Sequence, residues 1–311
     1  MSRGVLPWLV LAGALGAAAT PAAGADRGGR FVVYPDFASS HVAPRKIVVW
    51  LPEGYDRHRE RYAVLYMHDG QNLFDPETSM GHEPWAVDKH LAALERAQNV
   101  RPTIVVGIAN AGADRWREYA PAAAVAALDP ELRALVTEGA NGSTLSEDYL
   151  RFLVGELKPF IDRHYRTRPG RADTFVAGSS MGGLISLYAL SRYPEVFGGA
   201  GCLSTHWVLT TNPALLGPPP DPRVPRIAAA YIDWLRLHLP AAGSHRIYFD
   251  HGTVFLDGLY GPYQDEVDRI MAEHGFRDGI DWESRVFPGA THNEQAWRER
   301  LDQPLVFLLR P

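Results

Sequence analysis

Residues 174–192 read Thr-Phe-Val-Ala-Gly-Ser-Ser-Met-Gly-Gly-Leu-Ile-Ser-Leu-Tyr-Ala-Leu-Ser-Arg, and the architecture expected for the whole chain follows from them. An apolar run typical of a buried strand (174–177) leads into the pattern Gly-x-Ser-x-Gly at 178–182, and a helix-forming run follows at once. In this order the chain turns sharply from strand to helix, and the central hydroxyl stands clear of its neighbours at the tip. The stretch therefore predicts a strand–turn–helix unit with Ser180 at its apex.

The segments on either side alternate between strand type and helix type, which predicts an α/β fold with a mostly parallel central sheet and helices on both faces. Residues 103–108 are apolar on both faces, as expected of a central strand. Residues 30–34 and 46–51 are expected to form an antiparallel pair. The other strands are predicted at 63–67, 174–177, 198–203, 246–249 and 283–287, and the helices at 85–97, 145–165, 181–192, 262–274 and 293–309.

The helix at 145–165 has the clearest pattern. Thr144 and Glu147 have the spacing of a capping box, so we expect the helix to begin at this pair. Apolar residues then recur every three or four positions and share one face, which is expected to pack on the sheet: Leu150, Leu153, Leu157 and Ile161.

Residues 204–243 form the irregular zone of the sequence. They include Pro218-Pro219-Pro220 and a short helical stretch at 227–237. We interpret this zone as an insertion over the C-terminal strand ends, with the role of a lid, rather than as a second domain. Residues 26–311 are accordingly expected to form one α/β domain.

The N-terminus has the composition of a signal peptide. Met1-Ser2-Arg3 gives a short positive start, residues 4–19 are almost wholly apolar, and Ala23-Gly24-Ala25 fits the pattern that a signal peptidase cleaves. The apolar run is shorter than the roughly 20 residues that span a bilayer. We therefore predict removal of residues 1–25 and a secreted or periplasmic protein without a membrane partner; the alternative is an uncleaved membrane anchor.

Composition and charge exclude several classes of protein. Apolar residues make up 46% of the chain and charged residues 22%, which is unlike a disordered chain. The net charge of −5, without a dense basic run, argues against a nucleic-acid partner. The single cysteine, Cys202, cannot form an internal disulfide and is expected to be a buried strand residue. His82-Glu83 lacks the second histidine of a zinc motif, so neither a metal nor a cofactor is expected, and the sequence leaves the oligomeric state open.

A serine hydroxyl needs a base that takes its proton, and on this kind of fold the partners follow in the order serine, acid, histidine. His292 comes after a strand and a glycine turn and directly before a helix, so its ring can swing over Ser180. Two carboxylates, Asp250 and Asp257, follow the penultimate strand. Asp257 lies further into the loop and can reach the far nitrogen of the histidine, which favours it over Asp250.

The negative charge that develops on a substrate oxygen needs preorganised N–H donors. One is expected from the backbone of Met181, directly after Ser180. The second is expected from the loop after an earlier strand, where Gly70 allows a turn that points the N–H of Gln71 at the site. The alternative for residues 68–72 is a plain turn, because Asp-Gly turns are common.

At these positions the chain resembles the esterase family related to esterase D, a branch of the α/β hydrolases that includes feruloyl, acetyl-xylan and enterochelin-type esterases. The resemblance extends from the strand before His68 to the final helix. It rests on these segments: His68-Asp69-Gly70-Gln71-Asn72-Leu73-Phe74-Asp75, Val106-Gly107-Ile108 with Arg115 through Glu118-Tyr119-Ala120-Pro121, Gly178-Ser179-Ser180-Met181-Gly182-Gly183, and the loops of Asp257 and His292. The resemblance implies the α/β-hydrolase fold, a Ser–Asp–His triad without cofactor, and an oxyanion hole at Gln71 and Met181.

The expected function is hydrolysis of a carboxylic ester through an acyl-enzyme, with an aryl, sugar or siderophore ester as substrate. Acyl transfer to another alcohol, and a catalytically inactive binding protein on the same fold, are the alternatives. Aromatic and polar side chains suit such esters, and the candidates for contact with substrate are Trp85, Arg115, Trp207, Trp116 and His206. Arg115 has two interpretations: it binds a carboxylate or catecholate, or it forms an ion pair with Glu118.

Overall fold

The structure, a computed structural model, describes residues 20–21, 28–138 and 142–311. Most of the predicted signal peptide (1–25), including its cleavage pattern, lies outside the described residues, and its prediction is not tested by them. Thr20–Pro21 form the short strand β1. Within the described ranges, no helix has the length and apolar character needed to cross a membrane.

A nine-stranded sheet runs through the described part of the molecule in the order β1-β2-β3-β5-β4-β6-β7-β8-β9. β1, β2 and β3 are antiparallel to their neighbours, whereas β4 to β9 run parallel to one another. The loops that follow the parallel strands therefore meet at one edge of the sheet. The strands are β1 (Thr20–Pro21), β2 (Arg30–Phe37), β3 (Arg45–Leu51), β4 (Ala63–Met67), β5 (Thr103–Ile108), β6 (Thr174–Ser179), β7 (Gly199–Leu203), β8 (Arg246–His251) and β9 (Trp282–Val286).

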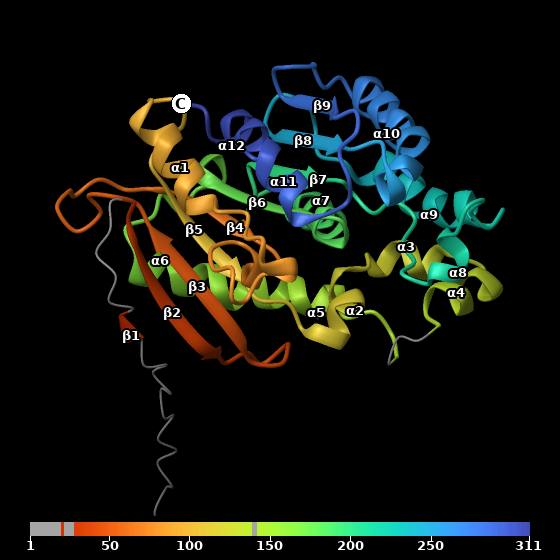
Figure 1. Ribbon diagram of the computed structural model, residues 1–311, viewed down its shortest axis with the longest axis horizontal. Helices are drawn as coiled ribbons and strands as arrows, with labels where there is room; N and C mark the ends of the chain where they lie inside the picture. The colour runs from red at the N-terminus through yellow and green to blue at the C-terminus, as the bar shows by residue number, and fades with distance from the viewer. Residues whose placement is uncertain (1–19, 22–27, 139–141) are drawn as a thin grey trace, which may run out of the picture.

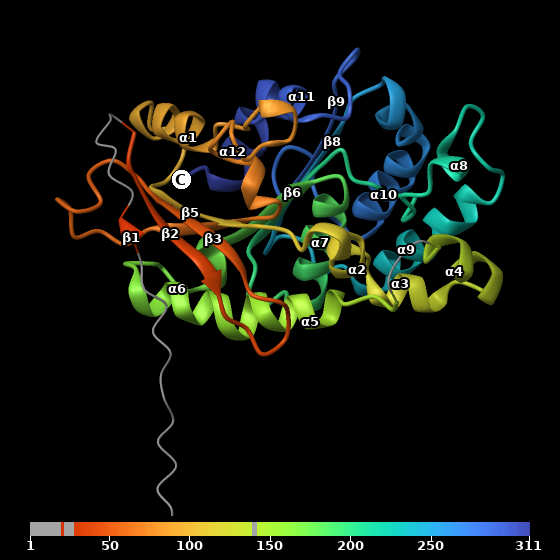
Figure 2. The ribbon, with the colours of Figure 1, turned by 60° about the horizontal axis from the view of Figure 1, so that its bottom comes forward.

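Helices cover both faces of the sheet (Figure 1), and Figure 2 shows the two helical layers with the sheet between them. One layer consists of α1 (Val87–Arg96), α11 (Glu294–Arg300) and α12 (Asp302–Leu309). The other consists of α5 (Ser146–Arg151), the π-helical segment η4 (Phe152–Leu157), α6 (Lys158–His164), α7 (Met181–Arg192), α9 (Val224–His238) and α10 (Gly261–Glu273). Four shorter helices lie towards one end of the molecule: α2 (Arg115–Tyr119), α3 (Ala122–Ala127), α4 (Pro130–Val136) and α8 (Pro213–Leu216).

The predicted α/β architecture is confirmed. β4, β5 and α7 coincide with their predicted ranges, and every residue of β5 is buried, as expected of a central strand. β2 and β3 form the predicted antiparallel pair, with Val32 opposite Val49. Cys202 is buried in β7.

The predicted capping box at Thr144 and Glu147 is wrong. The helix begins at Ser146, and Leu145 occupies the N-cap position without a side-chain hydrogen bond. Glu147 accepts a hydrogen bond from the hydroxyl of Tyr188 on α7 instead, which directs its carboxylate towards the neighbouring helix. The apolar face is as predicted, because its four residues are fully buried: Leu150, Leu153, Leu157 and Ile161.

The single helix predicted at 293–309 is two helices, α11 and α12, which meet at Leu301. Pro304 lies in the first turn of α12, where its nitrogen carries no hydrogen to donate to the carbonyl four residues earlier. One uninterrupted helix is therefore excluded. The break allows α12 to pack along β7 and β8.

Helix α9, inside the predicted insertion, is part of the layer that covers the sheet. Ile227, Tyr231 and Leu235 are buried in the core, and the Tyr231 hydroxyl donates to the carbonyl of Leu184 on α7 at 3.2 Å. Ion pairs also tie the start of α9 to the start of α4: Arg223–Glu131 and Arg226–Asp129. The lid prediction therefore concerns α8 and its flanking loops, and their movement stays a prediction.

Glu95, near the end of α1, gives the fold a pH dependence. Burial raises the pKa of its carboxyl from 4.5 to about 7, although the carboxylate accepts a hydrogen bond from the N–H of Thr103 at 2.9 Å. Because the folded state holds this proton more tightly than the unfolded state, the free energy of unfolding falls as pH rises from 4.5 to about 7.

Glu95→Gln keeps an acceptor and removes the charge. The variant is expected to gain stability relative to the wild type as pH rises through that window, and to keep the gain above it. Urea unfolding below, within and above the window measures the effect. A stability difference that stays constant with pH would show that Glu95 does not titrate in this way.

Candidate active site

Ser180 stands at the turn between β6 and α7. Its backbone is strained (φ 57°, ψ −123°), and its N–H donates to the carbonyl of Leu203 at the end of β7 at 2.9 Å. A Cβ on Gly178 would lie 3.0 Å from the backbone of Gly182, so a side chain at this position would crowd the turn. This is the predicted strand–turn–helix unit, with Ser180 partly exposed at its apex.

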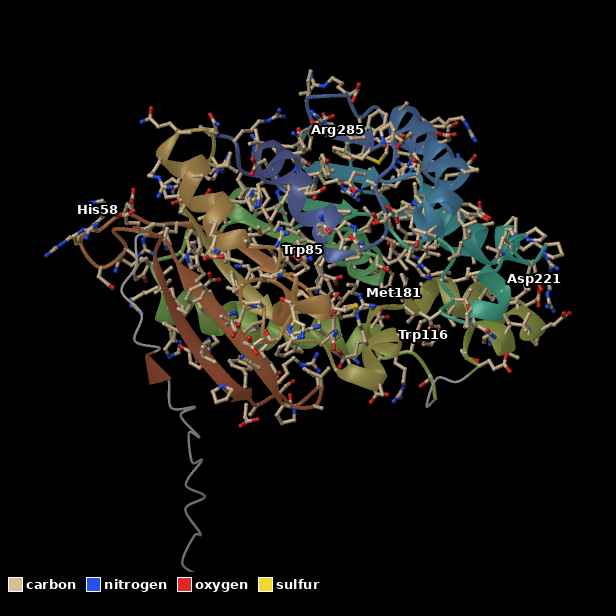
Figure 3. All side chains as sticks on the ribbon, viewed as in Figure 1. His58, Trp85, Trp116, Met181, Asp221 and Arg285 are labelled. Atoms are coloured by element: carbon tan, nitrogen blue, oxygen red, sulfur yellow. The ribbon has the colours of Figure 1, made fainter. Side chains whose placement is uncertain are left out.

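The N-terminus of α7 presents free backbone donors at this turn. Met181 is the first residue of the helix, so its N–H has no acceptor within the helix. The positive end of the helix dipole also favours negative charge there. Figure 3 labels Met181 at the start of α7, near the middle of the molecule. The position suits an oxyanion that forms on a group bonded to Oγ of Ser180.

His292 and Asp257 form a hydrogen-bonded pair. Nδ1 of His292, on the loop after β9, lies 2.6 Å from Oδ1 of Asp257. Asp257 is fully buried in the turn η6 (Phe255–Leu259) after β8, whereas the His292 side chain is 15% exposed. Burial alone would raise the pKa of the Asp257 carboxyl, but hydrogen bonds from His292, Ser204 and Gly252 lower it below its usual value. The low pKa keeps Asp257 ionised.

The ionised carboxylate fixes the tautomer of His292. Nδ1 carries the hydrogen that faces Asp257, which leaves Nε2 as the free base. Trp297 and Tyr260 hold the ring edge-to-face at centroid distances of 5.0 and 5.8 Å. Among the described residues, the hydrogen bond of His292 is to Asp257 and none joins it to Ser180. Catalytic hydrogen bonds of this kind often tighten only when a substrate binds.

A chain of contacts connects this pair with Ser180. The N–H of His206, on the loop after β7, donates to the carbonyl of Ser180 at 3.2 Å. Nδ1 of His206 lies 2.7 Å from the hydroxyl of Tyr260, which packs against His292. The serine, the acid and the histidine thus follow β6, β8 and β9, at the same edge of the sheet.

Asp250, the alternative acid, contacts Arg300 and not His292, which is hydrogen-bonded to Asp257. It is fully buried at the end of β8 and pairs with Arg300 of α11 at 3.0 Å. Burial raises the pKa of its carboxyl, and the Arg300 guanidinium opposes the rise. Of the two carboxylates that the sequence left open, the structure places Asp257 in contact with His292.

The loop after β4 contains the turn η1 (Gly70–Asn72), with Gln71 in the middle. A Cβ on Gly70 would lie 2.5 Å from the backbone of Gly107, so only glycine lets this loop pack on β5. The side-chain amide of Asn72, the last residue of the turn, donates a hydrogen bond to the carboxylate of Glu294 on α11 at 3.1 Å. This hydrogen bond ties the loop to the helix that directly follows the histidine loop.

Arg115 pairs with Asp69 of the same loop. Its Nε and Nη2 each lie 2.7 Å from the carboxylate, which also accepts from Asn110 at 2.6 Å. The interpretation that Arg115 pairs with Glu118 is wrong, because Glu118 forms a buried two-point ion pair with Arg45. Asp69 thus holds the Nε and Nη2 edge of the Arg115 guanidinium, and the Arg115 side chain remains 27% exposed.

Two predicted substrate contacts, Trp207 and Trp85, are buried. Trp207 is 1% exposed, packs against Tyr231 of α9, and donates from its indole to Gln264 at 3.2 Å. The structure therefore places Trp207 in the core, where α9 separates it from solvent. Trp85 is 3% exposed and packs against Trp297, beside the histidine.

Trp116 and His206 are also held by the protein itself. The indole of Trp116 donates to a main-chain carbonyl at 2.8 Å, and both ring nitrogens of His206 are engaged, by Tyr260 and Thr210. Burial lowers the pKa of His206 to about 3, so the ring is neutral near pH 7. Figure 3 labels Trp85 and Trp116. Arg115 is therefore the predicted contact whose side chain is open to a ligand.

No local pattern in the sequence marks the residues that support the acid. Ser204 lies 53 residues before Asp257, and Arg300 lies 50 residues after Asp250. For Ser204 the sequence offers one indirect signal, because this residue directly follows a predicted strand of the central sheet. Arg300 lies on an ordinary helix, where its burial depends on the tertiary fold.

The parallel sheet, the strained serine turn after β6 and the acid–histidine pair after β8 and β9 define an α/β-hydrolase fold. In the ranges that the structure describes, no group of three or more His, Cys, Asp or Glu side chains is arranged to hold a metal. The chain belongs to the Putative esterase family, which matches residues 39–308.

Curated relatives match part of the chain. The "Uncharacterized protein YbbA" of Bacillus subtilis is 23% identical over 164 residues, which cover 52% of this chain and 58% of the relative. The endo-1,4-beta-xylanase/feruloyl esterase of Xylanibacter ruminicola is 29% identical over 163 residues, which cover 50% of this chain and 19% of the relative. The matched segment is thus less than two thirds of the length of either relative.

Solved structures share the fold. A ferulic acid esterase superposes with a TM-score of 0.61 at 18% identity, covering 91% of this chain and 99% of that chain. The enterobactin esterase FES from Shigella flexneri superposes with a TM-score of 0.59 at 17% identity, covering 91% and 60%. At these identities the likeness shows the α/β-hydrolase fold.

Proposed function

We propose that this protein is a serine carboxylic-ester hydrolase that acts outside the cytoplasm through an acyl-enzyme intermediate. The observation that carries the proposal is the buried Asp257 carboxylate, 2.6 Å from Nδ1 of His292, at the sheet edge that also holds the strained turn of Ser180. Membership of an esterase family supports ester chemistry. The signal-peptide pattern of residues 1–25 supports a secreted or periplasmic location.

The first half-reaction acylates the serine. Oγ of Ser180 attacks the ester carbonyl carbon while Nε2 of His292 takes the hydroxyl proton. Asp257 stabilises the resulting imidazolium and does not take the proton itself. The backbone N–H groups of Met181 and Gln71 receive the charge on the carbonyl oxygen. The imidazolium then gives its proton to the alcohol oxygen as the ester C–O bond breaks.

The second half-reaction releases the acid. Nε2 of His292 takes a proton from water, and the hydroxide oxygen attacks the acyl carbon. The same two N–H groups stabilise the second oxyanion. The bond to Oγ of Ser180 then breaks, and the histidine returns its proton to that oxygen. The atoms balance with water alone, so the proposed reaction includes no cofactor.

The proposed substrate is an aryl, sugar or siderophore ester, either a small molecule or a glycan. The names of a feruloyl esterase relative and of an enterobactin esterase with the same fold support this class. Arg115, which Asp69 holds in a two-point ion pair, keeps part of its side chain open at the loop after β4. A guanidinium placed there suits a carboxylate or catecholate on the substrate.

A panel of esters tests this function. The purified protein is expected to hydrolyse a short-chain p-nitrophenyl ester and to release acid and alcohol in equal amounts. Feruloyl, acetyl-sugar and dihydroxybenzoyl esters then define the substrate. An added alcohol that takes the acyl group faster than water would reassign the protein to acyl transfer. A folded protein that turns over none of these esters and does not react with a fluorophosphonate would be an inactive binding protein.

Gly70→Ala tests the loop that carries Gln71. A Cβ at this position would lie 2.5 Å from the backbone of β5, so the loop must move and the N–H of Gln71 with it. Loss of one oxyanion donor is expected to lower kcat by about 10²-fold. Gly170→Ala is the matched control, because a Cβ there meets nothing within 4 Å. Equal kcat values for the two variants would remove Gln71 from the oxyanion hole.

A further inference from the structure

A buried cluster of charged and polar side chains lies behind the acid–histidine pair. Asp250 and Asp257 have no exposed side-chain surface, and Arg300 of α11 is 3% exposed. Nη2 of Arg300 lies 3.0 Å from Oδ1 of Asp250 and 3.8 Å from Oδ2 of Asp257. Ser204 is fully buried with φ 43° and forms hydrogen bonds with all three side chains: its N–H donates to Asp250, its hydroxyl donates to Asp257, and its hydroxyl oxygen accepts from Arg300. One guanidinium therefore lies between two buried carboxylates.

The orientation of the Ser204 hydroxyl is fixed by its neighbours. Its oxygen accepts hydrogen bonds from Nη2 of Arg300 at 2.8 Å and from the indole N–H of Trp297 at 2.9 Å. Because these nitrogens donate and do not accept, they occupy both lone pairs of the oxygen. The single hydroxyl hydrogen must then point to Oδ2 of Asp257, 2.7 Å away.

Asp257 is thereby surrounded by donors. Oδ2 accepts from Ser204 and from the N–H of Gly252 at 2.6 Å, while Oδ1 faces Nδ1 of His292. A protonated carboxyl would place its own hydrogen against one of these donors, so the surroundings favour the ionised form. The ionised form is the one that the proposed reaction needs.

The charges of the cluster nearly balance. With both carboxyls ionised, Asp250 and Asp257 contribute two negative charges and Arg300, which lies 3.0 Å from Asp250 and 3.8 Å from Asp257, contributes one positive charge. The buried group therefore carries one net negative charge while His292 is neutral, and proton uptake by the histidine brings the sum to zero. Because charges interact strongly where water is excluded, a change in this sum moves the pH at which the histidine takes up its proton.

We propose that Arg300 and Asp250 form a positioning pair for the reaction. Through Ser204 the pair holds Asp257 ionised and facing His292, and its balanced charge sets the pH range in which the histidine acts as a base. The role rests on the proposed function of the histidine, and it extends that function to three side chains that do not touch the substrate.

Other titratable groups face the cluster from the surrounding elements. Burial raises the pKa of Tyr248, which lies 3.3 Å from Asp250, and of Tyr260, which packs on His292, so neither phenol ionises near neutral pH. Burial keeps His206 neutral with a pKa of about 3. Burial and the neighbouring Asp250 raise the pKa of the Cys202 thiol on β7. His251 ends β8 with Nδ1 2.6 Å from the carbonyl of Gly252, and the adjacent strand β9 carries Glu283 and Arg285, which act on Tyr248. Asp69 and Arg115 lie on the side of the loop after β4, and Glu294 lies at the start of α11.

Asp250→Asn removes one charge and keeps an oxygen that can accept from Arg300 and Ser204. The titration midpoint of His292, followed by ¹⁵N-histidine NMR and assigned with His292→Gln, is expected to fall by about one pH unit, because the unbalanced guanidinium opposes an imidazolium. Asp250→Asn combined with Arg300→Gln removes both charges, and the midpoint is expected to return to within about 0.3 units of the wild type. The acid limb of kcat/KM is expected to move in the same way.

An unchanged titration midpoint of His292 in Asp250→Asn would overturn the proposal. A midpoint in the double variant that is shifted as far as in the single variant would also overturn it. If the single variant does not fold, ¹³C NMR of the wild-type carboxyls decides: the proposal requires both Asp250 and Asp257 to be ionised throughout the titration of His292, and a protonated Asp250 overturns it. Because NMR needs no turnover, the expected shifts in a protein that hydrolyses no ester would refute the proposed function and would still show that the pair controls the protonation of His292.

Discussion

Ser180→Ala is expected to lower kcat for ester hydrolysis by about 10⁶-fold, to the level that substrate binding and oxyanion stabilisation supply without a nucleophile. The substitution removes the oxygen that forms the acyl bond and leaves the rest of the turn in place. Alanine meets the same positive φ of 57° as the serine, so the backbone strain is not increased. The loss is therefore expected in kcat rather than in folding.

Turnover of a short-chain aryl ester, together with a urea unfolding curve for each protein, measures this effect. Ser191→Ala is the matched control on the same helix, because the hydroxyl of Ser191 is buried without a hydrogen-bond partner among the described residues. The control is expected to keep wild-type turnover. Ser180→Ala activity above about one hundredth of wild type would mean that another group attacks the ester.

Asp257→Asn is expected to lower kcat by about 10⁴-fold. The amide that replaces the carboxylate can turn its N–H groups to Nδ1 of His292, which must then accept. The ring hydrogen moves to Nε2 as a result, and the nitrogen that should take the proton of Ser180 is already protonated. The loss comes from the wrong tautomer, so KM is expected to change much less than kcat.

Asp250→Asn is the comparison variant that distinguishes the two candidate acids. Asp250 lies behind the pair and contacts Arg300 rather than His292, so its amide is expected to cost no more than about tenfold in kcat at the optimum pH of the variant. The opposite pattern, near-normal turnover in Asp257→Asn with a large loss in Asp250→Asn, would assign the acid to Asp250.

The parts of the fold that could be predicted from the sequence are those that local pattern determines. The run 103–108 is apolar on both faces and forms the fully buried β5. The turn at Ser180 could be predicted because glycines, a preceding strand and a following helix all lie within a few positions. The capping box at Thr144 failed because a competing long-range contact, from Tyr188 to Glu147, directs the glutamate elsewhere.

The parts of the site that could not be predicted depend on contacts between distant segments. Asp69, the partner of Arg115, lies 46 residues away, whereas Glu118, the ion-pair partner that the sequence suggests as one alternative, lies on the same short helix as Arg115. Trp207 lies on the loop after β7, at the same edge of the sheet as the site. It is nevertheless buried, because Tyr231 of α9 packs against it. The choice between the two carboxylates rests on reach alone in the sequence. The structure places Asp257 in contact with His292 and Asp250 in contact with Arg300 of α11, and the role of Asp257 as the acid stays a prediction.

Covalent labelling tests the central claim, that Ser180 attacks esters, most directly. A fluorophosphonate is expected to add once to the wild-type protein, and peptide mass spectrometry is expected to place the adduct on Ser180. The same reagent should leave Ser180→Ala unlabelled and should react slowly with Asp257→Asn, in which the base holds the wrong tautomer. An adduct on another residue, or hydrolysis that continues after Ser180 is fully labelled, would contradict the claim.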